Sequence, residues 1–243
     1  MNVIVCDHYE EMSRRAADIV ADIIKARPDC LLGLATGSTP VGMYDELVRR
    51  CEAGELDFSA VRSVNLDEYY PISPENAQSY RYFMNKNLFD RVNIDKANTA
   101  VPNGAAEDPE AECRAYEEKL AALGQVDVQV LGIGQNGHIG FNEPGETLHP
   151  LTHLTALTES TIKANARFFS EGEVMPTAAL TMGMGTILRA KKIIILANGE
   201  AKADAIATLL SGMLTTACPA SFLNLHADVT VICDHAAMSK VQA

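Results

Sequence analysis

The sequence is poor in basic residues and has no long apolar run. It contains 20 Lys and Arg residues against 32 Asp and Glu, which gives a formal net charge of −12 at pH 7. A chain this acidic is repelled by nucleic-acid phosphates and by anionic membrane surfaces, although one local basic pocket is compatible with the charge. No apolar stretch reaches the length of roughly 18 residues that a membrane span needs. We therefore expect a soluble protein that binds neither nucleic acid nor membrane.

Paired cysteine motifs and a targeting segment are also absent. The six cysteines form no CxxC pair, so neither a zinc site nor a disulfide framework is indicated. The N-terminus MNVIVCDHYE has no basic region, and its apolar run Val3–Cys6 is too short for a signal-peptide core. We expect a cytoplasmic protein whose cysteines are small buried residues.

Short β-branched runs alternate with longer amphipathic segments along the chain. Several of these runs are too continuously apolar for a sheet with one solvent-exposed face, so helices should cover both sides. The alternating order favours parallel strands joined by right-handed crossovers. We predict an α/β fold with one domain over residues 1–243, because no linker, charge block or repeat divides the chain. The strand candidates are Val3–Cys6, Leu31–Ala35, Val61–Leu66, Val126–Ile133, Ile193–Ala197 and Val229–Cys233.

Helices are predicted from apolar spacings of three and four and from end signals such as proline before and glycine after a segment. They run over Met12–Ile24, from Pro40 to Gly54, and from Asp108 to near Gly124. Residues 134–160 contain so many glycines and prolines that we expect no regular structure there. A long loop directly after a strand is often functional.

The first candidate motif is the turn that follows the strand Leu31–Ala35. Main-chain N–H groups of Gly37, Ser38 and Thr39 can point at an anion near the positive end of the next helix. The hydroxyl groups of Thr36, Ser38 and Thr39 add further donors. An ordinary helix N-cap explains the same turn equally well. No GKS or GKT sequence follows, which excludes a Walker A loop for nucleotide hydrolysis.

The second motif places Asp67 and Glu68 directly after an apolar run. Adjacent side chains of an extended backbone point to opposite faces, so one carboxylate can enter a cleft as a general base while the other makes structural contacts. Taken alone, the motif is better explained as the polar start of a loop. The spacing of companion ligands that a metal site needs is missing.

The third motif is a glycine-rich loop after the strand Val126–Ile133, and it carries Asn136, His138 and Glu143. Glycines permit close approach of a ligand, an imidazole exchanges protons near neutral pH, and Glu143 can orient the ring of His138. The pattern GxGxxG at residues 132–137 is also found in dinucleotide sites. More loop follows it in place of a helix, and no acidic residue lies at the expected offset, which disfavours that reading.

Together the three motifs resemble those of the glucosamine/galactosamine-6-phosphate isomerase family, and in particular its glucosamine-6-phosphate deaminases. The resemblance extends over nearly the whole chain, through LGLATGSTP, SVNLDEYY, LGIGQNGHIGFNEPG, KANARFF, ALTMGMGT and GEAK. It implies a Rossmann-like three-layer sandwich with a mostly parallel central sheet. It also implies conversion of glucosamine 6-phosphate and water to fructose 6-phosphate and ammonia, without a metal or an organic cofactor.

Two alternatives stay open. One is a hydrolase similar to the 6-phosphogluconolactonases, which share the phosphate turn and the general fold. The other is a sugar-phosphate sensor without catalysis, which is disfavoured because a binding protein has no need of a proton-transfer set. Release of ammonia from glucosamine 6-phosphate separates the three functions.

The resemblance implies roles for individual residues. Asp67 matches the base that moves a proton between C2 and C1 of the opened sugar, and His138 matches the acid/base for ring opening, with Glu143 and Asn136 beside it. Many members of the family have Asp where this chain has Asn136. Because a neutral amide brings no negative charge to the imidazole, we expect a different pH dependence of ring opening. The phosphate-binding positions are matched by Thr36, Gly37, Ser38, Thr39, Arg167 and Lys202.

Regulation is expected to differ from that of the longer, hexameric members, which N-acetylglucosamine 6-phosphate activates. Those enzymes bind the phosphate of the activator with basic residues shortly after the GFNEP loop, whereas residues 147–155 here contain no Lys or Arg. The chain also ends at Ala243 without the C-terminal extension of the allosteric members. We expect hyperbolic kinetics and a monomer or small homo-oligomer.

Overall fold

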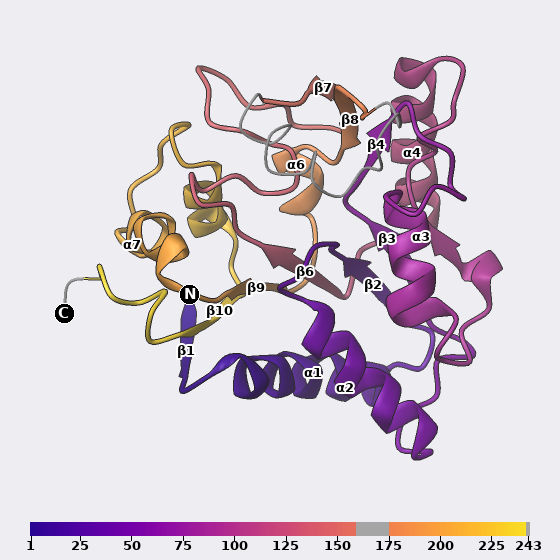
Figure 1. Cartoon of the computed structure of the whole chain (residues 1–243), viewed down its shortest axis with the longest axis horizontal. Helices are drawn as coiled ribbons and strands as arrows, with labels where there is room; N and C mark the ends of the chain where they lie inside the picture. The colour runs from indigo at the N-terminus through magenta and orange to yellow at the C-terminus, as the bar shows by residue number, and fades with distance from the viewer. Residues whose placement is uncertain (159–174, 242–243) are drawn as a thin grey trace.

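A seven-stranded sheet forms the centre of the computed structural model, which describes residues 1–158 and 175–241 (Figure 1). Its strands are β1 (Asn2–Cys6), β2 (Leu31–Leu34), β3 (Arg62–Asn65), β5 (Thr99–Ala100), β6 (Val128–Gly132), β9 (Ile193–Ala197) and β10 (Val229–Asp234). They lie in the order β1-β10-β9-β6-β2-β3-β5, and all neighbouring pairs are parallel. The predicted parallel α/β sheet is confirmed, and each of the six strand candidates forms a strand.

Helices cover both faces of the central sheet, as predicted. One face is covered by α1 (Tyr9–Ala26), α2 (Val41–Glu52), α3 (Tyr80–Met84) and the π-helical turn η1 (Asn85–Phe89) that continues α3. The other face is covered by α4 (Pro109–Leu123), α6 (Met184–Ile187), α7 (Ala203–Leu210) and the 3-10 segment η4 (Pro219–Leu225). Shorter 3-10 turns are η2 (Lys96–Asn98) and η3 (Glu200–Lys202). Figure 1 shows α1 and α2 together on one side of the sheet and α6 on the other, so the chain forms three layers.

Successive residues of the central strands point into two different cores. Leu31 packs on the side of α4, whereas its neighbour Leu32 packs on the side of α1 and α2. Ile195 and Ile194 of β9 divide in the same way. Burial of one such side chain stabilises the fold by roughly 1.5–3 kcal/mol. A strand buried on both faces needs apolar residues at every position, and such a continuous apolar run can be predicted from the sequence.

The three predicted helices are confirmed with their end signals. Pro40 is the N-cap residue of α2. Asp108 caps α4, since its Oδ1 accepts hydrogen bonds from the N–H groups of Glu110 and Ala111 at 3.0 and 2.9 Å. Gly124 ends α4 with a positive φ of 92°. Local sequence signals therefore fix where these helices begin and end.

A second, antiparallel sheet of three strands contains β4 (Asp67–Tyr70), β8 (Ala178–Thr181) and β7 (His153–Ala156), in that order. Two expectations are wrong here. Asp67 and Glu68 belong to a buried strand rather than to a polar loop, and β7 lies inside residues 134–160, where no regular structure was expected. The reason is pairing with the distant β8, in which Thr181 is the partner of both Asp67 and His153. Local patterns cannot reveal such pairing.

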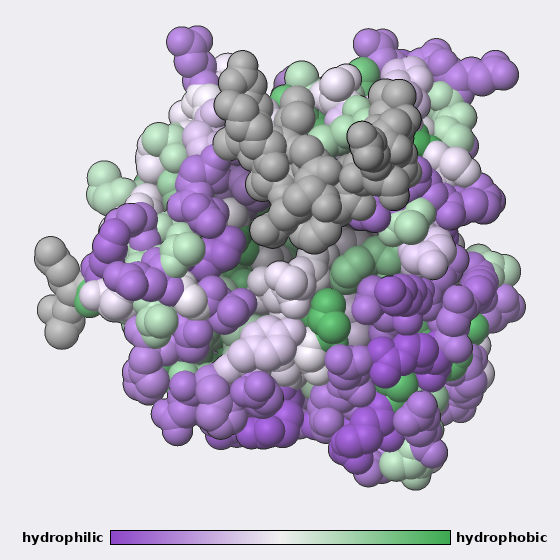
Figure 2. Space-filling model, in the orientation of Figure 1, coloured by the Kyte–Doolittle hydropathy of each residue, from purple (hydrophilic) through white to green (hydrophobic). Residues whose placement is uncertain are grey.

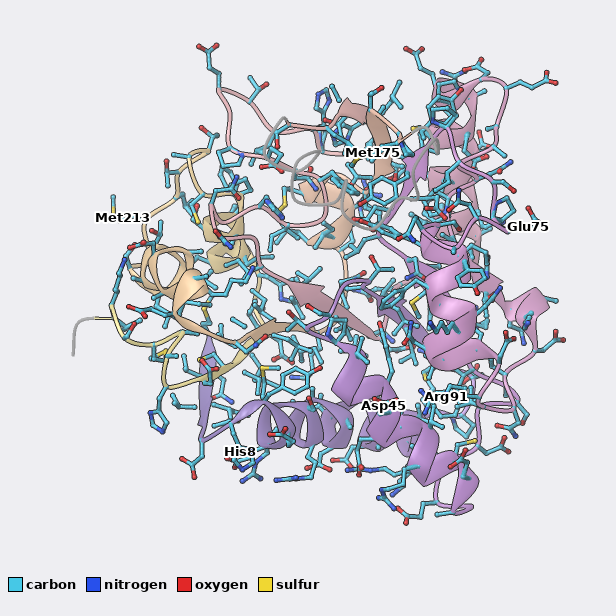
Figure 3. The ribbon with its side chains drawn as sticks, viewed as in Figure 1. His8, Asp45, Glu75, Arg91, Met175 and Met213 are labelled. Atoms are coloured by element: carbon cyan, nitrogen blue, oxygen red, sulfur yellow. The ribbon has the colours of Figure 1, made fainter. Side chains whose placement is uncertain are left out.

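The described surface is mostly hydrophilic on the face in Figure 2, with hydrophobic residues scattered among polar ones. Figure 3 shows Asp45 of α2 facing Arg91, which follows η1, and the Arg91 Nη1 lies 2.6 Å from the Asp45 Oδ1. Five of the six cysteines are buried and all six are free, whereas Cys51 is half-buried. Within the described ranges, no helix has the length and apolarity needed to cross a membrane.

Candidate active site

A cavity of about 620 Å³ lies at the carboxyl ends of β2 and β6. After β2 the chain adds β3 and β5 on one side of the sheet and then returns to add β6 on the other side. Loops after two such strands diverge, and this is where open α/β sheets bind ligands. All predicted site residues that the structure describes line the cavity: Thr36, Gly37, Ser38, Thr39, Asp67, Asn136, His138, Glu143 and Lys202. Arg167 lies outside the described residues.

Asp67 is the buried acid of the cavity and is only 6 % exposed. Burial, with a contribution from the negative charge of Glu68, raises the pKa of Asp67 to about 8. The glycine-rich loop (residues 132–145) comes close to this carboxyl at Gly140, whose φ is +59°. A Cβ atom there would lie 3.1 Å from the Asp67 Oδ2 and 2.9 Å from the Thr181 Oγ1, so the approach requires glycine.

The carboxylate of Glu68 is held by hydrogen bonds on the far side of β4. Its Oε1 accepts from the N–H groups of Tyr69 and Tyr80 at 2.9 and 2.8 Å. Its Oε2 accepts from the N–H of Arg81 at 2.9 Å and from the hydroxyl of Ser79 at 3.0 Å. Burial raises the pKa of Glu68, and these donors act against burial. Glu68 thus joins β4 to the start of α3.

Asn136, His138 and Glu143 form one group on the glycine-rich loop. Asn136 donates from Nδ2 to the Glu143 Oε2 at 2.7 Å and accepts at Oδ1 from the main-chain N–H of His138 at 3.2 Å. The His138 Nδ1 lies 3.3 Å from the Glu143 Oε1, which suits an ion pair with a protonated ring, but the two are not aligned as a hydrogen bond. The neutral amide therefore holds the carboxylate of Glu143 and the main chain of His138.

The turn at Thr36–Thr39 and the side chain of Lys202 supply groups for an anion. Among the described residues, no protein atom accepts a hydrogen bond from the main-chain N–H groups of Gly37, Ser38 and Thr39. Lys202 ends η3, and burial lowers the pKa of its amine. No Asp or Glu of residues 1–158 and 175–241 forms an ion pair with it. Amides and a cation that have no such partners in the described part of the chain are groups that can bind an anion.

Sequence reasoning missed the aromatic wall of the cavity. The ring of Tyr80 stacks on that of Phe141, with centroids 6.1 Å apart and planes 7° apart, and it lies 4.8 Å from the ring of Tyr69. Tyr80 and Phe141 line the cavity. Phe141 stands in the glycine-rich motif, but no local signal marks Tyr80, because it reaches the site only through the junction that Glu68 forms.

Two further observations bear on the kind of site. A second cavity of about 530 Å³, near Val126 and Arg189, contains none of the predicted site residues. Within the described ranges, His, Cys, Asp and Glu side chains do not gather in groups of three that could hold a metal ion. The first cavity therefore combines a buried carboxyl, an imidazole beside a carboxylate, and a turn whose main-chain N–H groups have no acceptor among the described residues.

These features define an α/β enzyme of the class that acts on small phosphorylated substrates by proton transfer. The chain belongs to the family of the glucosamine-6-phosphate isomerases and 6-phosphogluconolactonase, whose family model matches residues 7–232. It is 56% identical over 234 residues to a glucosamine-6-phosphate deaminase of Clostridium perfringens, covering 96% of this chain and 97% of the relative. A glucosamine-6-phosphate deaminase of Thermoanaerobacter pseudethanolicus is 54% identical over 241 residues, covering 99% and 95%.

Solved structures agree with this assignment. A structure described as a monomeric glucosamine-6-phosphate deaminase superposes with a TM-score of 0.95 at 48% identity, covering 99% of this chain and 100% of that one. A 6-phosphogluconolactonase from Leishmania guyanensis superposes with a TM-score of 0.76 at 23% identity, covering 100% and 99%. The second likeness concerns the fold alone. The predicted Rossmann-like three-layer fold and the family resemblance are confirmed.

Proposed function

We propose that this chain is a glucosamine-6-phosphate deaminase, which converts glucosamine 6-phosphate and water to fructose 6-phosphate and ammonia. The observation that carries the proposal is the cavity at β2 and β6, where a buried carboxyl, an imidazole and a phosphate-binding turn meet. The identity of 56% with a relative of that name supports the same substrate. We also propose that residues 1–243 act as one domain.

Ring opening is the first step, and His138 is its acid/base. The imidazole takes the proton of the C1 hydroxyl and returns a proton to the ring oxygen, so that the ring bond breaks and C1 becomes an aldehyde. Glu143, with its Oε1 3.3 Å from the His138 Nδ1, stabilises the protonated ring. Asn136 holds both partners by hydrogen bonds.

Asp67 carries out the isomerisation. Once C1 is an aldehyde, the C2 proton is acidic, and the ionised carboxylate removes it to give an enolamine. Return of that proton to C1 leaves a C2 imine, which water hydrolyses to the ketone of fructose 6-phosphate with release of ammonia. The raised pKa of Asp67 suits both halves of this transfer, since a stronger base takes the proton more readily and its acid returns it near neutral pH. The sequence of steps requires no metal or organic cofactor.

The phosphate of the substrate binds at the turn of Thr36–Thr39 and at Lys202. Main-chain N–H groups of Gly37, Ser38 and Thr39, the hydroxyls of Thr36, Ser38 and Thr39, and the amine of Lys202 supply the donors. Arg167 is proposed as a further phosphate ligand from the family resemblance. Because the chain carries a net charge of −12, these groups give a dianion its local positive site.

An assay of two products tests the function against its two alternatives. Purified protein is mixed with glucosamine 6-phosphate, and ammonia and fructose 6-phosphate are measured together; we expect equal amounts of both. A 6-phosphogluconolactonase would instead hydrolyse 6-phosphogluconolactone and release no ammonia. A sensor would bind glucosamine 6-phosphate without turnover. If no ammonia is released at concentrations of glucosamine 6-phosphate that saturate the protein, the proposal is ruled out.

Assembly and location are proposals of the same kind. We infer a monomer or a small homo-oligomer, supported by the structure at 48% identity that is described as monomeric. We also infer a cytoplasmic enzyme, supported by five buried cysteines that all carry free thiols. Light scattering of the purified chain and fractionation of cells test these two points.

A further inference from the structure

The hydroxyl group of Tyr9 joins the start of α1 to the turn at Thr36–Thr39, which is the proposed phosphate turn. Its single proton is shared between the main-chain oxygens of Ser38 and Thr39, each 3.1 Å from the hydroxyl oxygen, and it accepts from the main-chain N–H of Gly42 at 2.8 Å. Tyr9 does not line the cavity. Its side chain therefore lies behind the turn and contacts the main chain of the residues whose N–H groups point at the anion.

Close packing between α1 and α2 brings the hydroxyl of Tyr9 to this place. A Cβ atom on Gly42 would lie 2.4 Å from the Ser13 Oγ and 2.9 Å from the Tyr9 Cε1. Any side chain on Gly42 would push these two side chains of α1 away. Glycine at the first turn of α2 thus allows the contact with Tyr9, although its backbone conformation is ordinary.

The hydroxyl of Tyr9 shares with the main-chain N–H of Val41, 3.4 Å from the Ser38 oxygen, the task of holding one peptide plane of the turn. A trans peptide is planar, so the C=O of Ser38 and the N–H of Thr39 point in opposite directions. With the Ser38 oxygen held by the Tyr9 hydroxyl, the Thr39 N–H is directed away from Tyr9, toward the cavity that Thr39 lines. Rotation of that plane would exchange the donor for a carbonyl oxygen, which repels a phosphate.

We propose that Tyr9 is a positioning residue for phosphate binding, which holds the Ser38–Thr39 peptide with its N–H directed at the substrate phosphate. This inference rests on the proposed function, because it assigns the turn to the phosphate of the sugar. Tyr9 contacts no reacting group, so its removal weakens binding and leaves the chemical steps unchanged.

The test compares Tyr9→Phe with the wild-type protein. Phenylalanine keeps the ring that packs on Gly42 and removes only the hydroxyl. We expect KM for glucosamine 6-phosphate to rise roughly 3- to 10-fold, the effect of losing one or two hydrogen bonds, with kcat within about twofold of wild type. The Kd of fructose 6-phosphate by calorimetry and the inhibition constant of inorganic phosphate should rise by the same factor.

Two more variants make the result specific. Tyr70→Phe is the matched control. The Tyr70 hydroxyl also donates to a main-chain oxygen, that of Ala106 at 3.1 Å, but this oxygen does not belong to the turn at Thr36–Thr39. This variant should leave all three constants unchanged. Gly42→Ala displaces Tyr9 without removing its hydroxyl and should raise the same constants as Tyr9→Phe. Melting temperatures confirm that each variant is folded under the assay conditions.

The outcomes separate the two proposals. If inorganic phosphate and fructose 6-phosphate bind Tyr9→Phe within twofold of wild type, the positioning role is wrong, whatever happens to the melting temperature. A fall in kcat with unchanged phosphate affinity contradicts it as well. If the wild-type protein releases no ammonia, the proposed function fails, but the Kd values of fructose 6-phosphate and inorganic phosphate, both measured by calorimetry without turnover, still test Tyr9.

Discussion

Asp67 and Glu68 are neighbours on β4 whose carboxyl groups lie on opposite sides of the strand, and of the two only Asp67 lines the cavity. Both are buried, at 6 % and 1 % exposure. Glu68 accepts four hydrogen bonds, which stabilise its negative charge. The negative charge of Glu68, one residue away, adds to burial in raising the pKa of Asp67. The pair thus contains one carboxylate that joins β4 to α3 and one that faces the cavity, which is the proposed base.

Replacing the proposed base should abolish most of the turnover while substrate still binds. Asp67→Asn keeps the shape of the side chain and removes the basic oxygen. We expect kcat to fall by roughly two to four orders of magnitude, the usual effect of losing a general base, with the Kd of fructose 6-phosphate largely retained. Steady-state kinetics and calorimetry measure the two quantities. Turnover near the wild-type rate would assign the base to another residue.

The pH profile should report the raised pKa of Asp67. The ionised form is the base, so activity rises as pH rises through its pKa, and the acid limb of kcat/KM in the free enzyme should lie near pH 8 rather than near pH 4. Rates measured from pH 3.5 to pH 9.5 in buffers of constant ionic strength give this limb. An acid limb near pH 4 would show that the carboxyl is not desolvated in solution.

Removal of the charge on Glu68 should move the same limb. Glu68→Gln removes the negative neighbour, so the pKa of Asp67 falls and the acid limb shifts to lower pH. Glu75→Gln is the matched control, because Glu75 is exposed and points away from the molecule in Figure 3. An equal shift in both variants would indicate a change in net charge rather than the influence of Glu68.

The central sheet could be predicted from the sequence, but the second sheet could not. Strands buried on both faces, such as Ile193–Ala197, are continuously apolar, and this pattern is local. In β7, by contrast, half-buried and exposed residues alternate over four positions among glycines and prolines. Its partner β8 lies more than twenty positions away in the sequence, and no local pattern predicts their register.

The site shows the same division between local and distant determinants. Asp67, His138 and the turn at Thr36–Thr39 stand in compact motifs at the ends of strands, so their types and order suggested their chemistry. Tyr80 and Tyr9 had no such signal. Tyr80 enters the cavity because Glu68 accepts its main-chain N–H, and Tyr9 reaches the phosphate turn because residue 42 is glycine. These contacts depend on packing between elements, which only the folded chain reveals.

Loss of the amine of Lys202 should weaken binding rather than catalysis. Lys202→Ala removes the cation that lines the cavity beside the phosphate turn. We expect KM for glucosamine 6-phosphate to rise by roughly 10- to 100-fold, since a charge-assisted hydrogen bond to a dianion is lost. The variant should also lose most of its preference for the phosphorylated sugar. If the wild-type enzyme converted glucosamine as efficiently as glucosamine 6-phosphate, the assignment of the phosphate site would be wrong.

The segment after the glycine-rich loop bears on regulation. In the longer members of the family that this chain resembles, basic residues there bind the phosphate of N-acetylglucosamine 6-phosphate, whereas residues 147–155 here contain no Lys or Arg. The rings of His149 and His153 stack with centroids 4.2 Å apart. Burial and the neighbouring His149 lower the pKa of His153, which keeps that ring neutral at pH 7. The carboxylate of Glu117 accepts from the N–H and hydroxyl of Thr152 in the same segment.

We therefore expect no activation by N-acetylglucosamine 6-phosphate. An effector shifts an equilibrium only through different affinities for two states, and a segment with no Lys or Arg, a neutral His153 and a nearby carboxylate offers little affinity for a phosphate dianion in either state. Velocity against glucosamine 6-phosphate, measured at pH 7.5 with and without the N-acetylated sugar phosphate, should be hyperbolic in both series. Competition at the active site would raise KM and leave the curve hyperbolic. Sigmoidal curves that the effector converts to hyperbolic ones would contradict the prediction and would place a phosphate site outside the cavity at β2 and β6.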